Sequence, residues 1–170
     1  MNDRVREKSE LAVVYHLEFT LGEKRFALPL ENVERVVHAA EITVPPESPD
    51  LVEGFVNYKG RILPVVDISP RFHMPRIPLD PSFHFIIVTV KQKKYALIGH
   101  TVAGVMKTPG NTIVPPNDIV YGVEYLAGVI SMENGMMLIP DLGKTLAFAP
   151  GEIKALKDAV KKKHAKGKRT

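Results

Sequence analysis

The chain has 170 residues, of which 45% are hydrophobic, with no cysteine and a formal net charge of +4. This length allows one ordinary domain or two small ones, and a chain without cysteine has no disulfides, thiolate metal sites or cysteine nucleophiles. With neither disulfides nor a recognisable secretory leader, the protein is expected in the cytoplasm. No apolar run approaches the roughly 18 residues that a membrane-spanning helix needs.

The positive charge is concentrated at the C-terminus. Residues 152–170 hold eight Lys or Arg and two acidic residues, a net charge of +6, which leaves residues 1–151 with a net charge of −2. A basic tail can contact RNA, lipid or an acidic protein, although a solvated helix end is its commoner role. The body of the protein is therefore nearly neutral.

Strand patterns dominate the first half of the chain. Alternation predicts a half-buried strand whose core face carries Tyr15, Leu17, Phe19 and Leu21, with His16 on the opposite face. The elements expected after it are a turn at 22–23, a strand at 24–30, a short segment at 31–37, a loop rich in proline and acid at 41–50, a hairpin at 54–67 and a proline-rich connection at 73–82.

The second half repeats this kind of pattern and then changes to a helical period. Residues 83–90 are apolar on both faces, which predicts an inner strand, and a turn at 91–93 leads to residues 94–106. After a proline-containing loop at 108–119, the Asn134-Gly135 pair predicts a hairpin with a type I′ turn. Ile153, Leu156 and Val160 then form one stripe of a lysine-rich helix.

The two halves align as an internal repeat. Residues 19–37 match residues 88–106 without a gap, Gly54 matches Gly128, and Asp67 matches Asp141. We predict a body at 12–150 made of two pseudo-repeats, about 12–80 and 81–150, with a flexible tail at 1–11 and a basic helix and tail at 151–170. Units of about five strands bury little apolar surface alone, so the two are expected to share one core, with a groove at their seam.

The repeated hairpin contains residues with expected structural roles. Gly54 and Gly128 permit a close backbone approach, and Pro64, which has no N–H group, suits a bulge or an edge position. Turn positions are expected at Gly60, Asn134 and Gly135. Asp67 and Asp141 are expected to cap the turns after their strands, and the alternative is a carboxylate pair that performs hydrolysis.

No motif for catalysis or cofactor binding stands out. The six histidines are not paired at metal-ligand spacing, and the chain has no HExxH motif, no GxSxG elbow and no glycine-rich phosphate loop. We therefore predict a binding module that is not an enzyme and that uses no metal or cofactor. A basic β-barrel that binds RNA is the main alternative, opposed by the neutral body and by the absence of aromatic residues interleaved with arginine.

Residues 52–68, VEGFVNYKGRILPVVDI, resemble a run typical of the CheW-like coupling domain of bacterial and archaeal chemotaxis. That run has a Gly, an apolar-x-Asn-Leu-Arg-Gly turn, and an apolar strand with Pro and a terminal Asp. Residues 19–37 also resemble the opening hairpin of the family, so the resemblance covers about residues 12–150. It implies an all-β fold of two SH3-like five-stranded β-barrel subdomains that share a core, followed here by the basic helix.

The resemblance also implies a function and a set of contact residues. The family couples methyl-accepting chemoreceptors, through their cytoplasmic tips, to the regulatory domain of a CheA-type histidine kinase, and it does so without catalysis. It would reach the membrane only through the receptor, and no nucleic acid is expected. Receptor contacts in the groove between barrels match Val33, Gly54, Asn57 and Lys59. Kinase contacts are placed on the first barrel, at Phe26, Leu28 and Leu30.

Three positions depart from the family pattern. Lys59 replaces the usual Arg and keeps the charge without the planar fork. Tyr58 stands where Leu is usual, and we expect it to fill the same core position. His100 occupies a position that is commonly Asp, which we interpret as a surface substitution.

Overall fold

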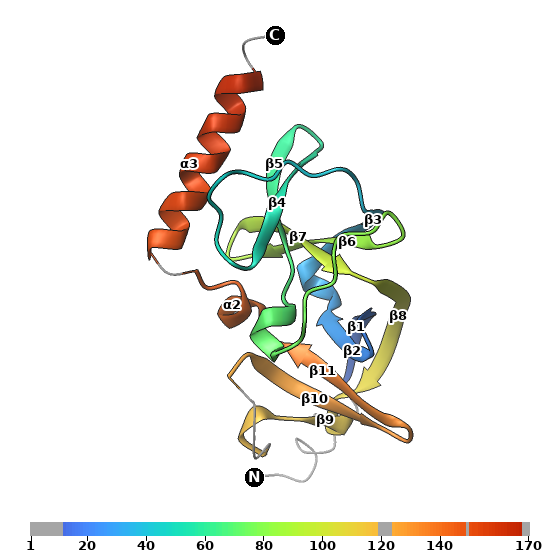
Figure 1. Cartoon of the computed structure of the whole chain (residues 1–170). Helices are drawn as coiled ribbons and strands as arrows, with labels where there is room; N and C mark the ends of the chain where they lie inside the picture. Colours follow the sequence, from blue (N-terminus) through green and yellow to red (C-terminus); the bar gives the residue numbers. More distant parts are fainter. Residues whose placement is uncertain (1–11, 119–123, 149, 168–170) are drawn as a thin grey trace.

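Two curled β-sheets make up the body of the protein, and a long helix follows them (Figure 1). The computed structural model describes residues 12–118, 124–148 and 150–167, so the predicted tail at 1–11 and residues 168–170 lie outside the described residues. The first sheet contains β1 (Val13–Leu21), β2 (Lys24–Pro29), β8 (Thr101–Pro109), β9 (Ile113–Val114), β10 (Leu126–Met132) and β11 (Gly135–Pro140). The second contains β3 (Val33–His38), β4 (Val52–Tyr58), β5 (Arg61–Val66), β6 (His84–Val90) and β7 (Lys93–Gly99).

Each sheet curls around a small core of its own. In the first sheet, ordered β8-β1-β2-β11-β10-β9, the edge strands contribute Met106 and Ile113 to one apolar cluster. In the second, ordered β3-β6-β7-β5-β4, the edge strands contribute Val37 and Val56 to another. Because opposite edges of one sheet contact the same cluster, we call the first sheet barrel A and the second barrel B.

Both barrels take strands from both halves of the chain. The hairpin β1–β2 belongs to barrel A with β8–β11, whereas β6–β7 belongs to barrel B with β3–β5. The expectation that each half folds as one unit is therefore corrected: the halves exchange their first hairpins. The reason is that β2 pairs in parallel with β11, and β7 pairs in parallel with β5, which joins the halves within each sheet.

The exchange is regular because the two barrels use equivalent registers. In β3 the pairing shifts at Glu34, and in β8 it shifts at the equivalent Ala103. In β4 and β10 the shifts fall just before Gly54 and Gly128. Such bulges increase the twist that closes a small barrel. The repeat in the sequence thus corresponds to a repeat in the backbone.

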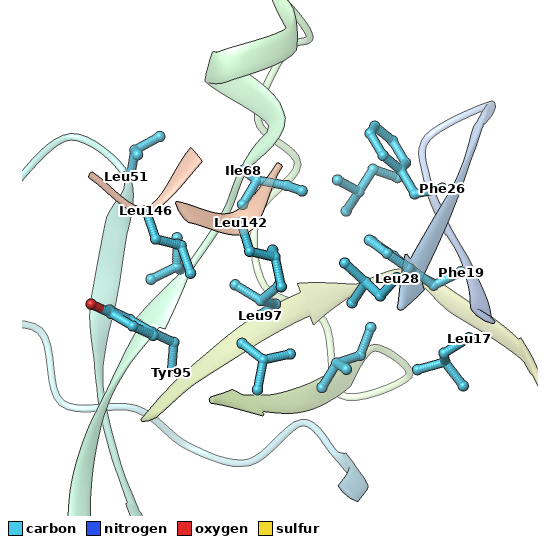
Figure 2. Packing of buried hydrophobic residues seen from close by; sticks show 14 of the residues in the cluster. Leu17, Phe19, Phe26, Leu28, Leu51, Ile68, Tyr95, Leu97, Leu142 and Leu146 are labelled. Atoms are coloured by element: carbon cyan, nitrogen blue, oxygen red, sulfur yellow. The ribbon is translucent and has the colours of Figure 1, made fainter. Parts of the chain in front are cut away.

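A third apolar cluster joins the barrels, and we call it the central cluster (Figure 2). Phe19, Phe26 and Leu28 reach it from barrel A, and Leu97 reaches it from barrel B. Short helices close it: η2 (Ser69–Phe72) brings Phe72 against Phe26, and α2 (Leu142–Thr145) contributes Leu142. The shared core expected from the sequence is present. The other short helices are η1 (Leu30–Asn32), η3 (Gly110–Thr112) and η4 (Pro116–Asp118).

The burial of strand β1 differs from the prediction at its first residues, Tyr15 and His16. Leu17, Phe19 and Leu21 are buried as expected, but Tyr15 is 45% exposed and His16 is only 2% exposed. His16 is buried because the second face of β1 lines the interior of barrel A, where its Cα partners are Pro29 and Met106. A strand in a closed barrel therefore has two buried faces, which simple alternation does not reveal.

Proline and turn positions also differ in part from expectation. Pro64 lies in β5, an inner strand between β4 and β7, and is tolerated because pairing with β7 covers only Val65 and Val66. The hairpin at Asn134 is present, but Met132 pairs with Gly135 and Asn134 has no positive φ, so the turn is not type I′.

The C-terminal helix α3 (Pro150–Gly167) runs beside β5 on the outside of barrel B (Figure 1). It begins one residue before the start of the basic helix predicted at 151–170, and Leu156 packs against the central cluster. Searching the described helices for a stretch long and apolar enough to cross a membrane finds none.

Candidate docking surfaces

The tip of the β4–β5 hairpin presents an ordered turn with an exposed lysine. Asn57 Oδ1 accepts a hydrogen bond from the Gly60 N–H at 3.0 Å. Lys59 and Gly60 have φ values of 50° and 80°, the pair of positive angles that a type I′ turn requires. The Lys59 Nζ lies 5.3 Å from the centroid of the Tyr58 ring, a cation–π contact that holds the lysine at the tip.

Tyr58 fills a core position, as expected, rather than forming a free anchor. Its ring packs against the barrel B cluster, and its hydroxyl is buried without a hydrogen-bond partner. The Lys59 ammonium group lies over this ring. The predicted contact residues at this tip are therefore Asn57 and Lys59.

The start of β3 lies at the same end of barrel B as this tip. Glu34 accepts a hydrogen bond from Lys94 at 2.7 Å, and this bond is the main cause of the lowered pKa of Glu34. The positive charges of Lys59 and Arg35 lower the pKa of Glu34 further. Val33, next to Glu34, is half-buried against the central cluster. Val33 and Lys59, predicted as receptor contacts, thus flank one small charged rim.

Gly54 lies in the interior of the protein and not on its surface. It is buried in β4, and a Cβ atom built there would lie 2.6 Å from the backbone oxygen of Thr43. Thr43 and Phe55 exchange backbone hydrogen bonds of 2.9 and 2.8 Å across it. A Cβ at the equivalent Gly128 would lie 3.0 Å from the Val114 oxygen. The predicted close approach is confirmed at both glycines, and Gly54 has no exposed side chain to offer a partner.

The residues predicted to contact a kinase are mostly inaccessible. Phe26 and Leu28 are fully buried in the central cluster, because β2 is an inner strand between β1 and β11. Their assignment to a docking surface is therefore corrected to core packing. Leu30, in η1, is half-buried and remains available at the surface.

Asp67 and Asp141 are caps, as the sequence predicted. Asp67 Oδ1 accepts a hydrogen bond from the Ser69 N–H at 2.9 Å, and this carboxylate is 1% exposed. Asp141 is the N-cap of α2, and its Oδ1 accepts from the Lys144 N–H at 3.1 Å. Each carboxylate is thus occupied by the backbone after its own strand, which supports capping and not the hydrolytic pair.

His100 is a structural residue, so its interpretation as a surface substitution is corrected. Its Nδ1 accepts a hydrogen bond from the Gly22 N–H at 2.8 Å, and its ring stacks on Phe83 with centroids 4.2 Å apart. Burial lowers the pKa of His100, and the nearby Asp67 carboxylate opposes this shift. The imidazole therefore links the β1–β2 turn of barrel A to Phe83, which precedes β6 of barrel B.

Sequence reasoning missed Arg71, which bridges the two halves. Its guanidinium donates to the backbone oxygens of Thr145 and Ala147 and to the Tyr125 hydroxyl, each at 3.2 Å. The guanidinium carbon also lies 4.9 Å from the Tyr125 ring centroid. Two of these acceptors are backbone oxygens, which leave no signal in a sequence.

The described residues contain two surface hollows of interest. One, of about 880 Å³, is open and lies between the loop at 44–51, Arg71 and α3. The other, of about 460 Å³, lies between α3 and barrel B. No group of three or more His, Asp or Glu residues within 12–118, 124–148 and 150–167 is arranged to hold a metal ion.

The geometry agrees with what comparison with known proteins finds. The profile of the CheW-like domain matches residues 16–149. The chain is 25% identical to the chemotaxis protein CheW of Treponema pallidum, covering 81% of this chain and 84% of that protein. It is 25% identical to CheW of Klebsiella aerogenes, covering 87% and 89%.

A solved structure and a kinase add to this comparison. The crystal structure of the scaffolding protein TtCheW from Thermoanaerobacter tengcongensis superposes with a TM-score of 0.70 at 29% identity, covering 77% of this chain and 90% of that chain. The chemotaxis protein CheA of Listeria monocytogenes is 30% identical over 115 residues, which are 63% of this chain and 18% of that protein. A part of that protein is therefore similar to the two-barrel body.

Proposed function

The chain belongs to the CheW-like family, and on this premise we propose that it is a chemotaxis adaptor that couples methyl-accepting receptors to a CheA-type histidine kinase. The observation that carries the proposal is the match of the family profile to residues 16–149, which include almost all of both barrels. The similarity to part of a CheA protein supports kinase docking between two domains of like fold. The adaptor acts by binding, without catalysis, in the cytoplasm.

The charged rim of barrel B is the proposed receptor contact. Asn57 and Lys59 are held at the tip by the turn and by the Tyr58 ring, so little side-chain freedom is lost on binding. Val33 supplies a half-buried apolar neighbour. The tip of a receptor is a helical hairpin, and a helix with an apolar stripe and an acidic flank fits such a surface.

The kinase contact is proposed near Leu30. This residue lies in η1, just after the inner strand β2, whose side chains Phe26 and Leu28 are buried in the central cluster. A half-buried leucine on a short, rigid helical turn is suited to packing against an apolar surface of a second barrel.

Reconstitution tests this function. Receptor fragment, kinase and this protein are mixed, and kinase autophosphorylation is measured with each component omitted in turn. We expect receptor control of the kinase only when all three are present. The proposal fails if kinase activity responds to the receptor equally without this protein, or if neither partner co-sediments with it.

A charge reversal at the tip sharpens the receptor assignment. Lys59→Glu is expected to weaken receptor binding about tenfold, as loss of a charged contact at an interface rim and a new repulsion imply. The matched control is Glu133→Lys, because Glu133 is the equivalent residue in the turn of the β10–β11 hairpin of barrel A. Equal effects of the two variants on receptor affinity would contradict the assignment of the contact to barrel B.

Only the basic tail supports the alternative function of nucleic-acid binding. The relatives reported above include none named for nucleic-acid binding. Lys157 and Lys161 of α3 lie beside β5 and β7 of barrel B.

A further inference from the structure

Helix α3 does not fill the space between itself and barrel B. A pocket of about 460 Å³ remains there, within the size range of small-molecule sites. Its floor is apolar and comes from Leu63, Pro64 and Tyr95 of the barrel, and Leu156 and Val160 of α3 form its opposite wall. The barrel side of this pocket lies within residues 16–149, the matched family domain, whereas its α3 wall lies beyond them.

The rim of the pocket is cationic. Arg61, Lys93, Lys94, Lys157 and Lys161 line it, and none of its lining residues is acidic. Lys94 is paired with Glu34, whereas no ion pair within the described part of the chain engages the other four cations. Like charges gathered around an apolar floor repel one another and attract an anion, so the pocket favours a ligand with one apolar part and one negative part.

The equivalent surface of barrel A differs from this pocket in its charge and in its apolar cover. There Arg25 is paired with Glu18 at 2.7 Å, as its counterpart Lys94 is paired with Glu34, but Glu23 stands in place of Gln92. Phe72 covers Phe26 with ring centroids 5.2 Å apart. The barrel B surface therefore differs from its barrel A counterpart in having no acidic residue in the β6–β7 turn and in the two lysines, Lys157 and Lys161, that α3 adds to the rim.

We propose that this pocket binds a single-chain anionic amphiphile, such as a medium-chain fatty acid. The acyl chain lies on the floor between Tyr95 and Leu156, where it replaces missing van der Waals contacts. The carboxylate lies at the rim between Lys93 and Lys157. A space of this volume accommodates one acyl chain, and not the two long chains of a membrane phospholipid. The inference stands apart from the adaptor function.

Titration calorimetry of the full-length protein with dodecanoate, kept below its micelle concentration, tests the proposal. We expect saturable binding of one molecule per chain. Lys157→Gln with Lys161→Gln is expected to weaken binding at least tenfold. The matched control, Lys24→Gln with Lys144→Gln, removes two exposed lysines elsewhere and should change the affinity less than twofold, because Lys24 is the barrel A counterpart of Lys93.

Dodecylammonium separates the proposed site from simple adsorption. It has the same chain and the opposite charge, so it should bind at least tenfold more weakly than dodecanoate. Equal binding of the two amphiphiles, equal binding by the lysine variant, or no saturable binding overturns the proposal. Methyl NMR gives the location: shifts at Leu63 and Leu156 support the pocket, and shifts confined to exposed Met136 or Val105 count against it.

Discussion

Barrel A and barrel B share strand order and register but differ in their interiors. The interior of barrel B is apolar and includes Phe85 and Ile87. The equivalent positions of barrel A are His16 and Glu18. The register of β1 against β8 matches the register of β6 against β3, so His16 corresponds to Phe85 and Glu18 corresponds to Ile87. One backbone plan therefore encloses two chemically different cores.

The difference indicates which features the fold requires. Both barrels keep the close glycine, the bulges and the cap, while the polar residues of barrel A are accommodated unequally. Glu18 is half-buried and finds Arg25 at 2.7 Å. His16 Nδ1 and Thr108 Oγ1 are buried without a hydrogen-bond partner in the described structure. Backbone geometry is thus fixed more strictly than interior polarity.

Exchanging the two interior residues should give the largest effect. Phe85→His removes ring contacts and buries a polar group in the apolar barrel, so we expect a loss of about 3–4 kcal/mol in the free energy of unfolding. His16→Phe removes an unpaired nitrogen and should change stability by less than about 1 kcal/mol. Urea unfolding followed by circular dichroism measures both. Equal losses for the two variants would mean that the interiors do not differ energetically.

The paired glycines should give an intermediate effect. Gly54→Ala places a Cβ atom 2.6 Å from a backbone oxygen, whereas Gly128→Ala places it 3.0 Å from one. We expect losses of about 2–3 kcal/mol and about 1 kcal/mol, respectively, since backbone must move in the first case. Urea unfolding followed by circular dichroism measures the free energy of unfolding of both variants. A Gly128→Ala variant less stable than Gly54→Ala would contradict the ranking of the two contacts.

The smallest expected effect is a pH dependence that originates in barrel A. Burial lowers the pKa of His16, so the unfolded chain binds a proton below about pH 6.5 that the folded chain resists. Stability should therefore fall as the pH decreases from 6.5 to 5.5, by at most about 1 kcal/mol per histidine, the limit for a group that stays neutral in the folded chain. The His16→Phe variant should lose the part of this pH dependence that comes from His16. The part that comes from His100, whose pKa is also lowered by burial, should remain. An unchanged pH profile in the variant would exclude His16 as a source.

Much of the backbone plan was predictable because it depends on local chemistry. The matched residues at 19–37 and 88–106 predicted the duplication, and each hairpin glycine predicted a close approach. Asp67 and Asp141 predicted caps because a carboxylate after a strand accepts nearby N–H groups. Each of these features needs only a few adjacent residues.

The features that were missed depend on contacts between distant residues. A repeat shows which segments are equivalent, but not that β2 pairs with β11 instead of β5. His100 was interpreted as a surface residue because its two partners, Gly22 and Phe83, are not its neighbours in the sequence. The residues proposed for kinase contact were placed by likeness alone, and burial of Phe26 and Leu28 left only Leu30.

The exchange of first hairpins makes the molecule an interlocked pair. A single cut in the connection at 73–82 would produce two pieces, each with strands that belong to both barrels. Neither piece could close a barrel by itself, yet the two should reassemble by complementation when mixed. For the same reason, we expect the two barrels to unfold together in one thermal transition. Each half of the chain supplies strands to both barrels, so unfolding of one barrel disrupts the other.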